Sequence, residues 1–350
     1  MRRAWAVLGV LVTVLAACSA DGGPDGVELA EGWTAEVVRE DLDGPTQVAF
    51  APDERVLVAE LAGGEDAGDG RILDLGPTGA SDPTVVADGL LTPTGLQVLP
   101  NGVLLVQEQV DVVAVEPDGT RTVLVTDSPF NGRSQGTVGQ LDPVGLNGSI
   151  AVIPLVTVTG TGSGPTPAPG SGVLSTVASD ELGPVAVGFK NAHAHAVGPD
   201  GELYVTEIGD GRYDGEPPPD ELNLIPADVL QLALDGNGDP YDGGWPRCTG
   251  DADPTEEFGA TTEECERLPR PLALFPPRAT PTSVAVTQSG RVLVALWVEN
   301  RVVEVDPETG EVTEVATGFD RPQHLLAMPD GSVLLTVHGS GQLVRLTPPA

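Results

Sequence analysis

The chain has 350 residues, of which 52 are acidic and 17 basic, giving a formal net charge of −35. So many carboxylates would repel nucleic-acid phosphates, and this argues against a nucleic-acid partner. The 45 glycines and 33 prolines separate short runs of valine and leucine. That pattern is typical of all-β sandwiches, barrels and propellers.

Residues 1–18 predict a bacterial lipoprotein signal peptide. A basic start is followed by an apolar stretch too short to span a membrane, and then by small residues before Cys18. This ending resembles a lipobox, whose cysteine carries the lipid and becomes the first residue of the mature protein. Residues 19–31 are expected to form a flexible tether, and residues 32–350 a single domain. We therefore expect an extracytoplasmic protein that contacts the cell membrane only through a lipid anchor.

Five segments share one pattern, in which an apolar pair precedes a tight turn and a strand rich in valine and leucine. They are residues 45–61, 93–109, 191–208, 281–297 and 321–338. Their starts lie roughly 40–50 residues apart, with two gaps of about double length, which is the spacing of β-propeller blades. Residues 144–160 supply a degenerate blade in the first gap. The sequence thus predicts an all-β, six-bladed β-propeller, with another all-β fold as the alternative.

Two cysteines remain once Cys18 carries a lipid. Cys248 and Cys265 form an even pair in an oxidising compartment, which predicts a disulfide. The alternative is a metal site, but two cysteines without a nearby histidine are a poor set of zinc ligands.

Polar residues cluster where the repeats begin. In a propeller each innermost strand starts near the central channel, so residues that precede these strands are expected to meet at one mouth. The residues concerned are Lys190, Asn191, His193, Arg321, Gln323 and His324.

The central stretch of the chain carries a recognisable order of motifs. They are Lys190-Asn191, Pro199-Asp200-Gly201, Thr206-Glu207-Ile208-Gly209, residues 220–225 (DELNLI) and Gly244-Trp245-Pro246. In this order they resemble the soluble glucose/sorbosone dehydrogenase family. That family consists of six-bladed propellers that oxidise aldoses with pyrroloquinoline quinone (PQQ) and calcium. The likeness covers residues 188–346 and is weak over residues 32–187.

The resemblance implies site residues position by position. Lys190, Asn191, Arg321 and Gln323 stand where the family binds its quinone, and the backbone carbonyls of Gly209 and Asp210 stand where it holds calcium. Two of these positions differ from the family, because Lys190 and Gln323 replace arginines. A lysine keeps the charge but loses the bidentate fork of arginine.

A second departure concerns the catalytic base, which in the family is a histidine of an early blade. This chain has no histidine before His193. Histidine titrates near neutrality, as a base for a sugar hydroxyl should. We therefore expect His193 or His324 to act as the base, unless the chemistry has been lost.

Residues 235–242 alternate Asp and Asn oxygens with glycine, as the start of an EF-hand does, but they lack its glycine and its final glutamate. The segment is either an isolated calcium loop or an ordinary Asx-rich turn.

Two functions follow from the sequence. The first is PQQ- and calcium-dependent oxidation of a sugar or related alcohol, with an electron acceptor that the sequence does not identify. The alternative is a catalytically degenerate propeller that binds ligands or proteins at the cell surface. A metal-dependent propeller similar to lactonases is a third possibility, although its ligand set is not identifiable here. Fold alone does not decide among them.

Overall fold

The computed structural model describes residues 23–65, 67–99, 101–108, 111–126, 139–140, 151–155, 173–177, 184–209, 217–255 and 258–349. The predicted lipidation residue Cys18 and the predicted calcium-site residue Asp210 lie outside these ranges. Among the described residues, no helix is long and apolar enough to cross a membrane.

Each of the five predicted repeats folds as an antiparallel strand pair. The pairs are β3 (Pro45–Phe50) with β4 (Val56–Glu60), β7 (Gly95–Val98) with β8 (Leu104–Gln107), β15 (Ala192–Val197) with β16 (Leu203–Glu207), β22 (Pro281–Val286) with β23 (Val292–Leu296), and β26 (Pro322–Ala327) with β27 (Val333–Val337). The turns need a left-handed residue, which glycine adopts without strain. In the Pro199-Asp200-Gly201 turn this residue is Gly201, with φ of 87°.

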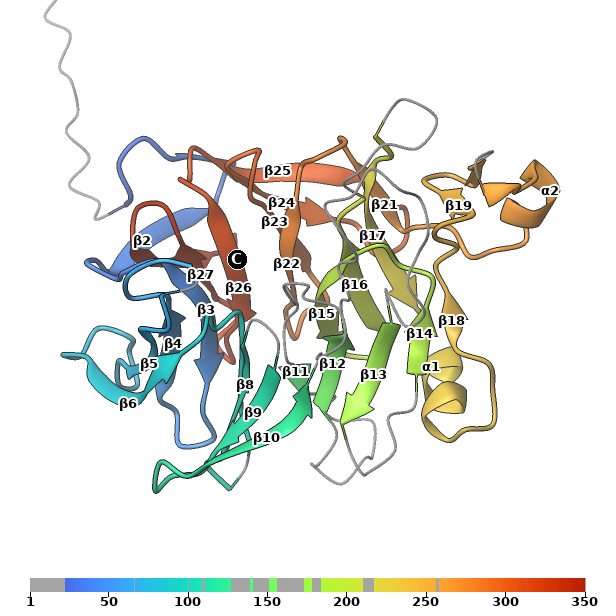
Figure 1. Cartoon of the computed structure of the whole chain (residues 1–350). Helices are drawn as coiled ribbons and strands as arrows, with labels where there is room; N and C mark the ends of the chain where they lie inside the picture. The colour runs from blue at the N-terminus through green and yellow to red at the C-terminus, as the bar shows by residue number, and fades with distance from the viewer. Residues whose placement is uncertain are drawn as a thin grey trace, which may run out of the picture.

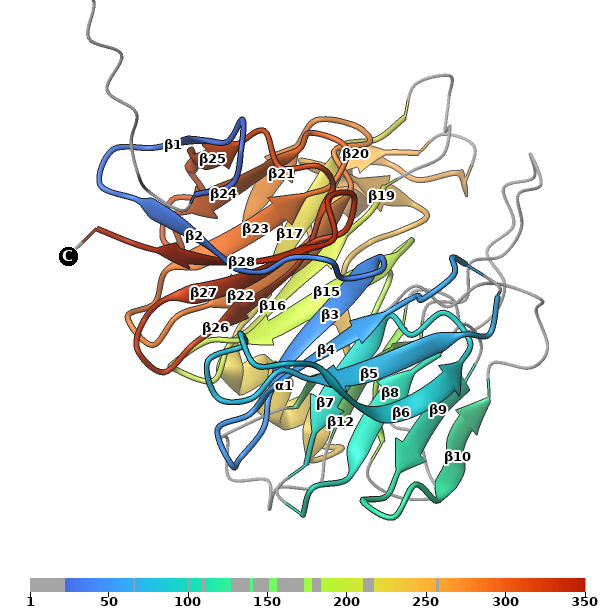
Figure 2. The same ribbon diagram turned by 90° about the vertical axis from the view of Figure 1, so that its left-hand side faces the viewer.

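Further strands extend each pair outward into a sheet. They are β5 (Gly70–Asp74) and β6 (Thr84–Leu90), β9 (Asp111–Val115) and β10 (Arg121–Thr126), β17 (Asp220–Ile225) and β21 (Ala273–Phe275), β24 (Arg301–Val305) and β25 (Val312–Thr317), and β28 (Gln342–Thr347). The N-terminal segment completes the last two sheets, since β1 (Glu28–Leu29) pairs with β25 and β2 (Thr34–Arg39) pairs with β28 (Figure 2). The two ends of the domain are therefore joined in one sheet.

The sheets are arranged around a central axis (Figure 1). Their innermost strands contact one another in the spatial order β15, β22, β26, β3 and β7. The hydrophobic core lies between neighbouring sheets; for example, Tyr204 and Leu222 pack with Val294 and Val303 of the next sheet. Similar clusters fill the other interfaces of this series. This architecture confirms the prediction of an all-β propeller.

The number of blades differs from the prediction of six, because the described strands and side chains form five blades. One further sheet contains β11 (Gly139–Gln140), β12 (Ala151–Leu155), β13 (Val173–Val177), β14 (Pro184–Val187) and β18 (Tyr241–Asp242). Strand β12 falls inside the predicted degenerate blade, residues 144–160. For most of this sheet the backbone alone is described. The exceptions include Ala186 and Tyr241, which pack with the core of β15–β17.

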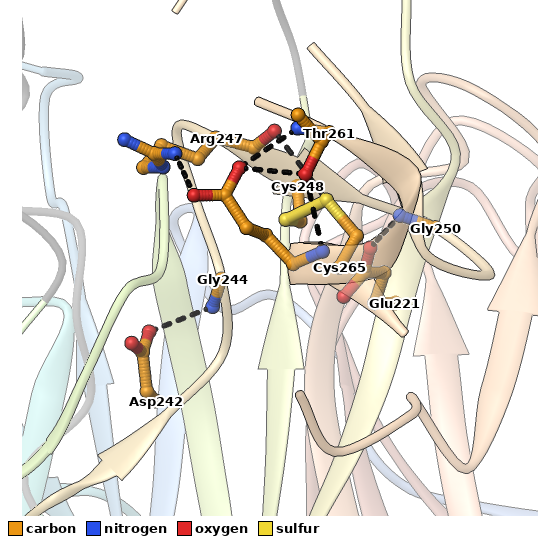
Figure 3. Close-up of a disulfide and its surroundings, with 9 residues drawn as sticks. Glu221, Asp242, Gly244, Arg247, Cys248, Gly250, Thr261 and Cys265 are labelled. Carbon is orange, nitrogen blue, oxygen red and sulfur yellow. Dashed lines mark hydrogen bonds and ion pairs between the residues drawn. A yellow bond between two sulfur atoms is a disulfide. The ribbon is translucent and has the colours of Figure 1, made fainter. Parts of the chain in front are cut away.

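A lobe is inserted between β17 and β21. It holds α1 (Ala227–Leu234), β18, β19 (Cys248–Thr249), β20 (Asp253–Pro254) and α2 (Thr262–Cys265). The predicted disulfide between Cys248 and Cys265 is present, with a Cα–Cα distance of 5.5 Å (Figure 3). Next to it, the Gly250 N–H donates to Glu221 Oε1 at 2.6 Å and so ties the lobe to β17.

Candidate functional site

A repeated irregularity of the innermost strands creates the wall of an axial cavity. In four blades the pairing register shifts at the second residue of the innermost strand. Such a shift re-aims a side chain and is common next to functional sites. The residues at these shifts are Thr46, His193, Thr282 and Gln323, and all four line one cavity of about 310 Å³. The backbone thus directs four separate side chains to one place.

A second ring of the wall comes from the residue that follows the second strand in the same four blades. Its backbone N–H donates to the carbonyl of the residue before the innermost strand. These residues are Leu61, Ile208, Trp297 and His338, and all four line the cavity. The remaining lining residues are Glu65, Thr92, Thr94, Thr280 and Arg321.

Glutamates near the ends of the second strands hold the loops that lead into the cavity. In three blades a carboxylate accepts a backbone N–H of the loop before the innermost strand: Glu60 from Asp43 at 2.9 Å, Glu108 from Leu91 at 2.7 Å, and Glu207 from Lys190 at 2.7 Å. The glutamate of the Thr206-Glu207-Ile208-Gly209 motif therefore holds the backbone of Lys190. Equivalent carboxylate–backbone hydrogen bonds occur in two other blades.

His338, Trp297 and Arg321 form a contact cluster in the wall. The rings of Trp297 and His338 lie 5.1 Å apart between centroids, at 46° to each other. The Arg321 guanidinium lies over Trp297 at 5.7 Å from the ring centroid, a cation–π contact. Arg321 is the only lysine or arginine among the described residues that line the cavity. The cluster combines a flat aromatic surface, a fixed positive charge and an imidazole.

His193, one of the two predicted bases, lines the cavity with only 6% of its surface exposed. Its Nδ1 lies 2.9 Å from the Thr282 carbonyl oxygen. A carbonyl only accepts, so Nδ1 carries the hydrogen and Nε2 carries the lone pair. Burial lowers the pKa of His193 to about 4, although the hydrogen bond to Thr282 opposes this. The ring is therefore neutral near pH 7.

His324, the other predicted base, is not among the residues that line the cavity. It follows Gln323, the residue at the register shift, and strand alternation turns it away from the side chain of Gln323. Its Nδ1 accepts the Val48 N–H at 3.3 Å from the neighbouring blade. Burial, together with His193 and His195, lowers the pKa of His324 to about 3. The ring is held inside the protein as a neutral hydrogen-bond acceptor.

The four predicted quinone-binding residues divide into two pairs. Arg321 and Gln323 line the cavity, whereas Lys190 and Asn191 are not among its lining residues. The backbone of Lys190 is held by Glu207, and the carbonyl of Asn191 accepts the Ile208 N–H at 2.9 Å. The main chain of this pair is thus tied to the edge of the cavity at Ile208.

The predicted calcium residue Gly209 directly follows Ile208. Its N–H donates to Asp220 Oδ1 at 2.7 Å, and it lines a second, very small cavity of about 10 Å³ together with Glu207 and Glu221. Within the described ranges, no group of three or more His, Cys, Asp or Glu side chains is placed to hold a metal ion. Such groups consist of side chains, whereas the calcium ligand predicted at Gly209 is a backbone carbonyl.

The two glutamates of the small cavity are an unusual buried pair. Glu207 and Glu221 are Cα partners on β16 and β17, with 4% and 5% of their surfaces exposed. Burial raises the pKa of Glu207 well above 4.5, and the nearby Glu221 raises it further. Burial also raises the pKa of Glu221, to about 7. The pair therefore holds protons at a pH where exposed glutamates are ionised.

In the segment of residues 235–242, Asp242 Oδ1 accepts the Gly244 N–H at 2.9 Å, which is an Asx turn. Asp235 Oδ1 accepts from Gln231 Nε2 at 2.9 Å at the end of α1. Both side chains make local hydrogen bonds, as expected if the segment is an ordinary Asx-rich turn.

Sequence reasoning missed His338 and Trp297, because it considered only residues near the starts of innermost strands. A signal was present in the repeats themselves. Leu61, Ile208, Trp297 and His338 are the last residues of four of the five repeated segments. Aligning the segments by their final positions would have placed these side chains in one ring.

Comparison with protein-family models finds no match, and comparison with curated proteins finds none either. Solved structures do match. The PQQ domain of pyranose dehydrogenase from Coprinopsis cinerea, in its holo form, superposes with a TM-score of 0.72 at 17% identity, covering 94% of this chain and 99% of that one. The two chains therefore share one fold.

Two further solved structures support the same conclusion. The calcium structure of the Trichoderma reesei carbohydrate-active enzyme of family AA12 gives a TM-score of 0.69 at 16% identity, covering 92% of this chain and 97% of that one. The apo form of the soluble aldose sugar dehydrogenase from Escherichia coli gives 0.61 at 16% identity, with coverages of 90% and 99%. The resemblance found in the sequence is thereby confirmed for the fold.

Proposed function

We propose that this protein is a PQQ- and calcium-dependent dehydrogenase that oxidises a sugar or a related alcohol. The observation that carries the proposal is the axial cavity of about 310 Å³, in which Arg321, Trp297, His193 and His338 meet. A volume of this size falls at the lower end of the range for small-molecule sites. The similar folds of a pyranose dehydrogenase PQQ domain, a carbohydrate-active enzyme of family AA12 and an aldose sugar dehydrogenase support the choice of chemistry.

The lining residues fit a planar, anionic quinone. Trp297 offers an aromatic surface, and the Arg321 side chain is 46% exposed, so its guanidinium is able to reach a carboxylate. Gln323 and the hydroxyl of Thr282 add polar groups to the same wall. These four residues would hold the cofactor, with Lys190 and Asn191 near its edge. When bound, PQQ supplies a two-electron acceptor for the substrate carbon.

Calcium is proposed at the backbone carbonyls of Gly209 and Asp210. Hard cations of this kind favour oxygen ligands, including backbone carbonyls. Ile208, the residue before Gly209, lines the axial cavity, which supports a metal position at the edge of the same site.

The chain itself would orient the substrate and accept its proton. Two neutral imidazoles, His193 and His338, contribute to the wall, and each has its Nδ1 near a backbone carbonyl oxygen. Each ring therefore keeps a lone pair on Nε2 and is able to accept a proton from a hydroxyl. The hydroxyls of Thr46 and Thr280 donate to backbone carbonyls, so their oxygens would accept hydrogen bonds from other sugar hydroxyls.

The test is reconstitution of the purified protein with PQQ and calcium. Cofactor binding is followed by quenching of tryptophan fluorescence, and activity by reduction of an artificial dye with a panel of aldoses and sugar alcohols. We expect PQQ to bind only when calcium is present, and at least one sugar to reduce the dye. Failure of PQQ to bind at any calcium concentration would refute the proposal.

The second candidate is a propeller that binds ligands without turnover. It is favoured by the single arginine of the described wall and by the absence of Lys190 and Asn191 from the lining. Calorimetric titration with the same sugars separates the two. Sugar binding that needs no PQQ, together with no dye reduction, would establish the binding module.

Two broader features belong to the same proposal. We propose that the sheet containing β11–β14 is the sixth blade, because its strands contact both β7 and β15. We also propose that Cys18 anchors the protein outside the cytoplasmic membrane. A Cys18→Ala variant should then lose metabolic labelling with palmitate and leave the membrane fraction.

A further inference from the structure

The His338 ring packs against the backbone of the first blade at Gly44 and Pro45. Gly44, with φ of 63°, immediately precedes β3, and a Cβ atom there would come within 3.2 Å of His338 Cε1. The next residue, Pro45, offers its carbonyl oxygen to His338 Nδ1 at 3.2 Å. The ring is thus held in place by the neighbouring blade, whose innermost strand is β3.

The hydrogen bond to Pro45 determines which ring nitrogen is available. The carbonyl accepts, so Nδ1 carries the hydrogen and the lone pair is on Nε2. Within the described part of the chain, no residue hydrogen-bonds to His338 Nε2, and this nitrogen is not among the fully buried unsatisfied atoms. Since His338 lines the axial cavity, Nε2 is accessible there to a ligand hydroxyl.

The charges around His338 suit a group that must accept a proton. Glu65, from the loop after β4, lines the same cavity, and Asp320 precedes Arg321 at the entry to β26. Burial is the largest effect and, together with Arg321, holds the pKa of His338 below its usual range, while the Pro45 carbonyl and these two carboxylates oppose the shift. Trp297 packs against the ring without adding charge. The two carboxylates lower the cost of the positive charge that forms when the ring takes up a proton.

The other two candidate histidines lack these features. His193 lines the cavity but is more deeply buried, and its pKa of about 4 makes it a weak base. The Nδ1 of His324 is already engaged as an acceptor, and the ring lies outside the cavity lining. Of the three, only His338 combines access, a free lone pair and carboxylates that stabilise the protonated ring.

We propose that His338 is the catalytic base that takes the proton from the substrate hydroxyl. This inference rests on the function proposed above. The O–H bond breaks and its proton moves to Nε2, while the C–H bond of the same carbon breaks and its hydride passes to an ortho-quinone acceptor of the PQQ class. The carbon is oxidised to a carbonyl, which is a lactone when it is the anomeric carbon of an aldose, and the quinone is reduced by two electrons.

The test compares His338→Asn with the matched variants His193→Asn and His324→Asn, each loaded with PQQ and calcium. Asparagine keeps an N–H donor near the position of Nδ1 but has no basic lone pair. We expect His338→Asn to lose about 10²- to 10⁴-fold in kcat, the usual contribution of a general base. Its affinity for PQQ, measured by fluorescence quenching, should stay unchanged.

Two further readouts separate a base from a structural residue. In the wild type the acid limb of the kcat/KM profile should reflect a group whose pKa lies below 6.5, and this limb should disappear in His338→Asn. Added imidazole should restore part of the activity of His338→Ala, because a free base is able to occupy the vacated space.

The outcomes distinguish the inference from the function on which it rests. If wild-type protein binds no PQQ and oxidises no sugar, both are overturned. If the wild type is active and His338→Asn keeps its kcat and its acid limb, the proposed function stands and His338 is not the base. A large loss of kcat in His193→Asn alone would transfer the role to His193. A variant that fails to bind PQQ is replaced by His338→Ala with imidazole, whose lack of rescue counts against the inference.

Discussion

Replacing Glu221 by glutamine should make the protein more stable at neutral and alkaline pH. Glu221 is 5% exposed and receives the Gly250 N–H at 2.6 Å and the Asn223 amide at 3.3 Å. Burial and Asp220 raise its pKa from 4.5 to about 7 in the folded protein, and the two hydrogen bonds only partly oppose this. The folded state therefore holds the proton more tightly than the unfolded state does.

The sign and size of the effect follow from that difference. The stability associated with protonated Glu221 is present in full below pH 4.5 and is lost as the pH rises toward 7. Each pH unit between the two values corresponds to about 1.4 kcal/mol, so ionised Glu221 costs about 3 kcal/mol above pH 7. Glutamine stays neutral and its amide oxygen still accepts from Gly250. The gain of Glu221→Gln at pH 8 should be smaller, about 1–2 kcal/mol, because its NH₂ group loses an acceptor position facing Asn223.

The assay is urea unfolding of wild type and Glu221→Gln between pH 4.5 and 8, with the disulfide intact and with EDTA present so that no cation compensates the carboxylates. The wild-type midpoint should fall as the pH rises, and this slope should be smaller in the variant. Some slope should persist, since Glu207 also has a raised pKa. Glu36→Gln, on the exposed face of β2, controls for the removal of one charge. Equal slopes in wild type and Glu221→Gln would refute the reasoning.

Three further predictions concern the lobe and the cavity wall. The double variant Cys248→Ser/Cys265→Ser should lose about 3 kcal/mol, the chain-entropy value for a short closed loop, measured as a lower urea midpoint; no change would mean that the lobe is held without its disulfide. Gly44→Ala should cost about 1–2 kcal/mol through its left-handed backbone and should reduce kcat by displacing His338, whereas the exposed left-handed Gly119→Ala should affect stability alone. Trp297→Leu should weaken PQQ binding by roughly tenfold in fluorescence titrations, because stacking and the contact with Arg321 are lost together; unaltered affinity would place the quinone elsewhere.

The propeller was predictable because each repeat contains its own turn residues between two strand-forming runs. Residues 281–297 contain two runs of mostly buried residues with a left-handed glycine at the turn between them, and they form β22 and β23 as expected. Residues 144–160 match this pattern only in part: Asn147-Gly148 is a turn signal, but only a short run precedes it and Pro154 interrupts the run that follows. The five clear repeats therefore fold as predicted, whereas the predicted sixth blade depends on a stretch with weak local preference.

The site was predictable only in its location. That innermost strands meet at an axis follows from topology, and it placed His193, Arg321 and Gln323 in the wall. Which side chain faces the axis depends on a one-residue shift of register, and such a shift sends neighbouring residues to opposite faces. The shift at Gln323 turns His324 away, and the residue after β27 brings His338 in. The proposed base therefore lies one strand later than His324 in the same blade, so the lack of a histidine before His193 does not contradict the proposed chemistry.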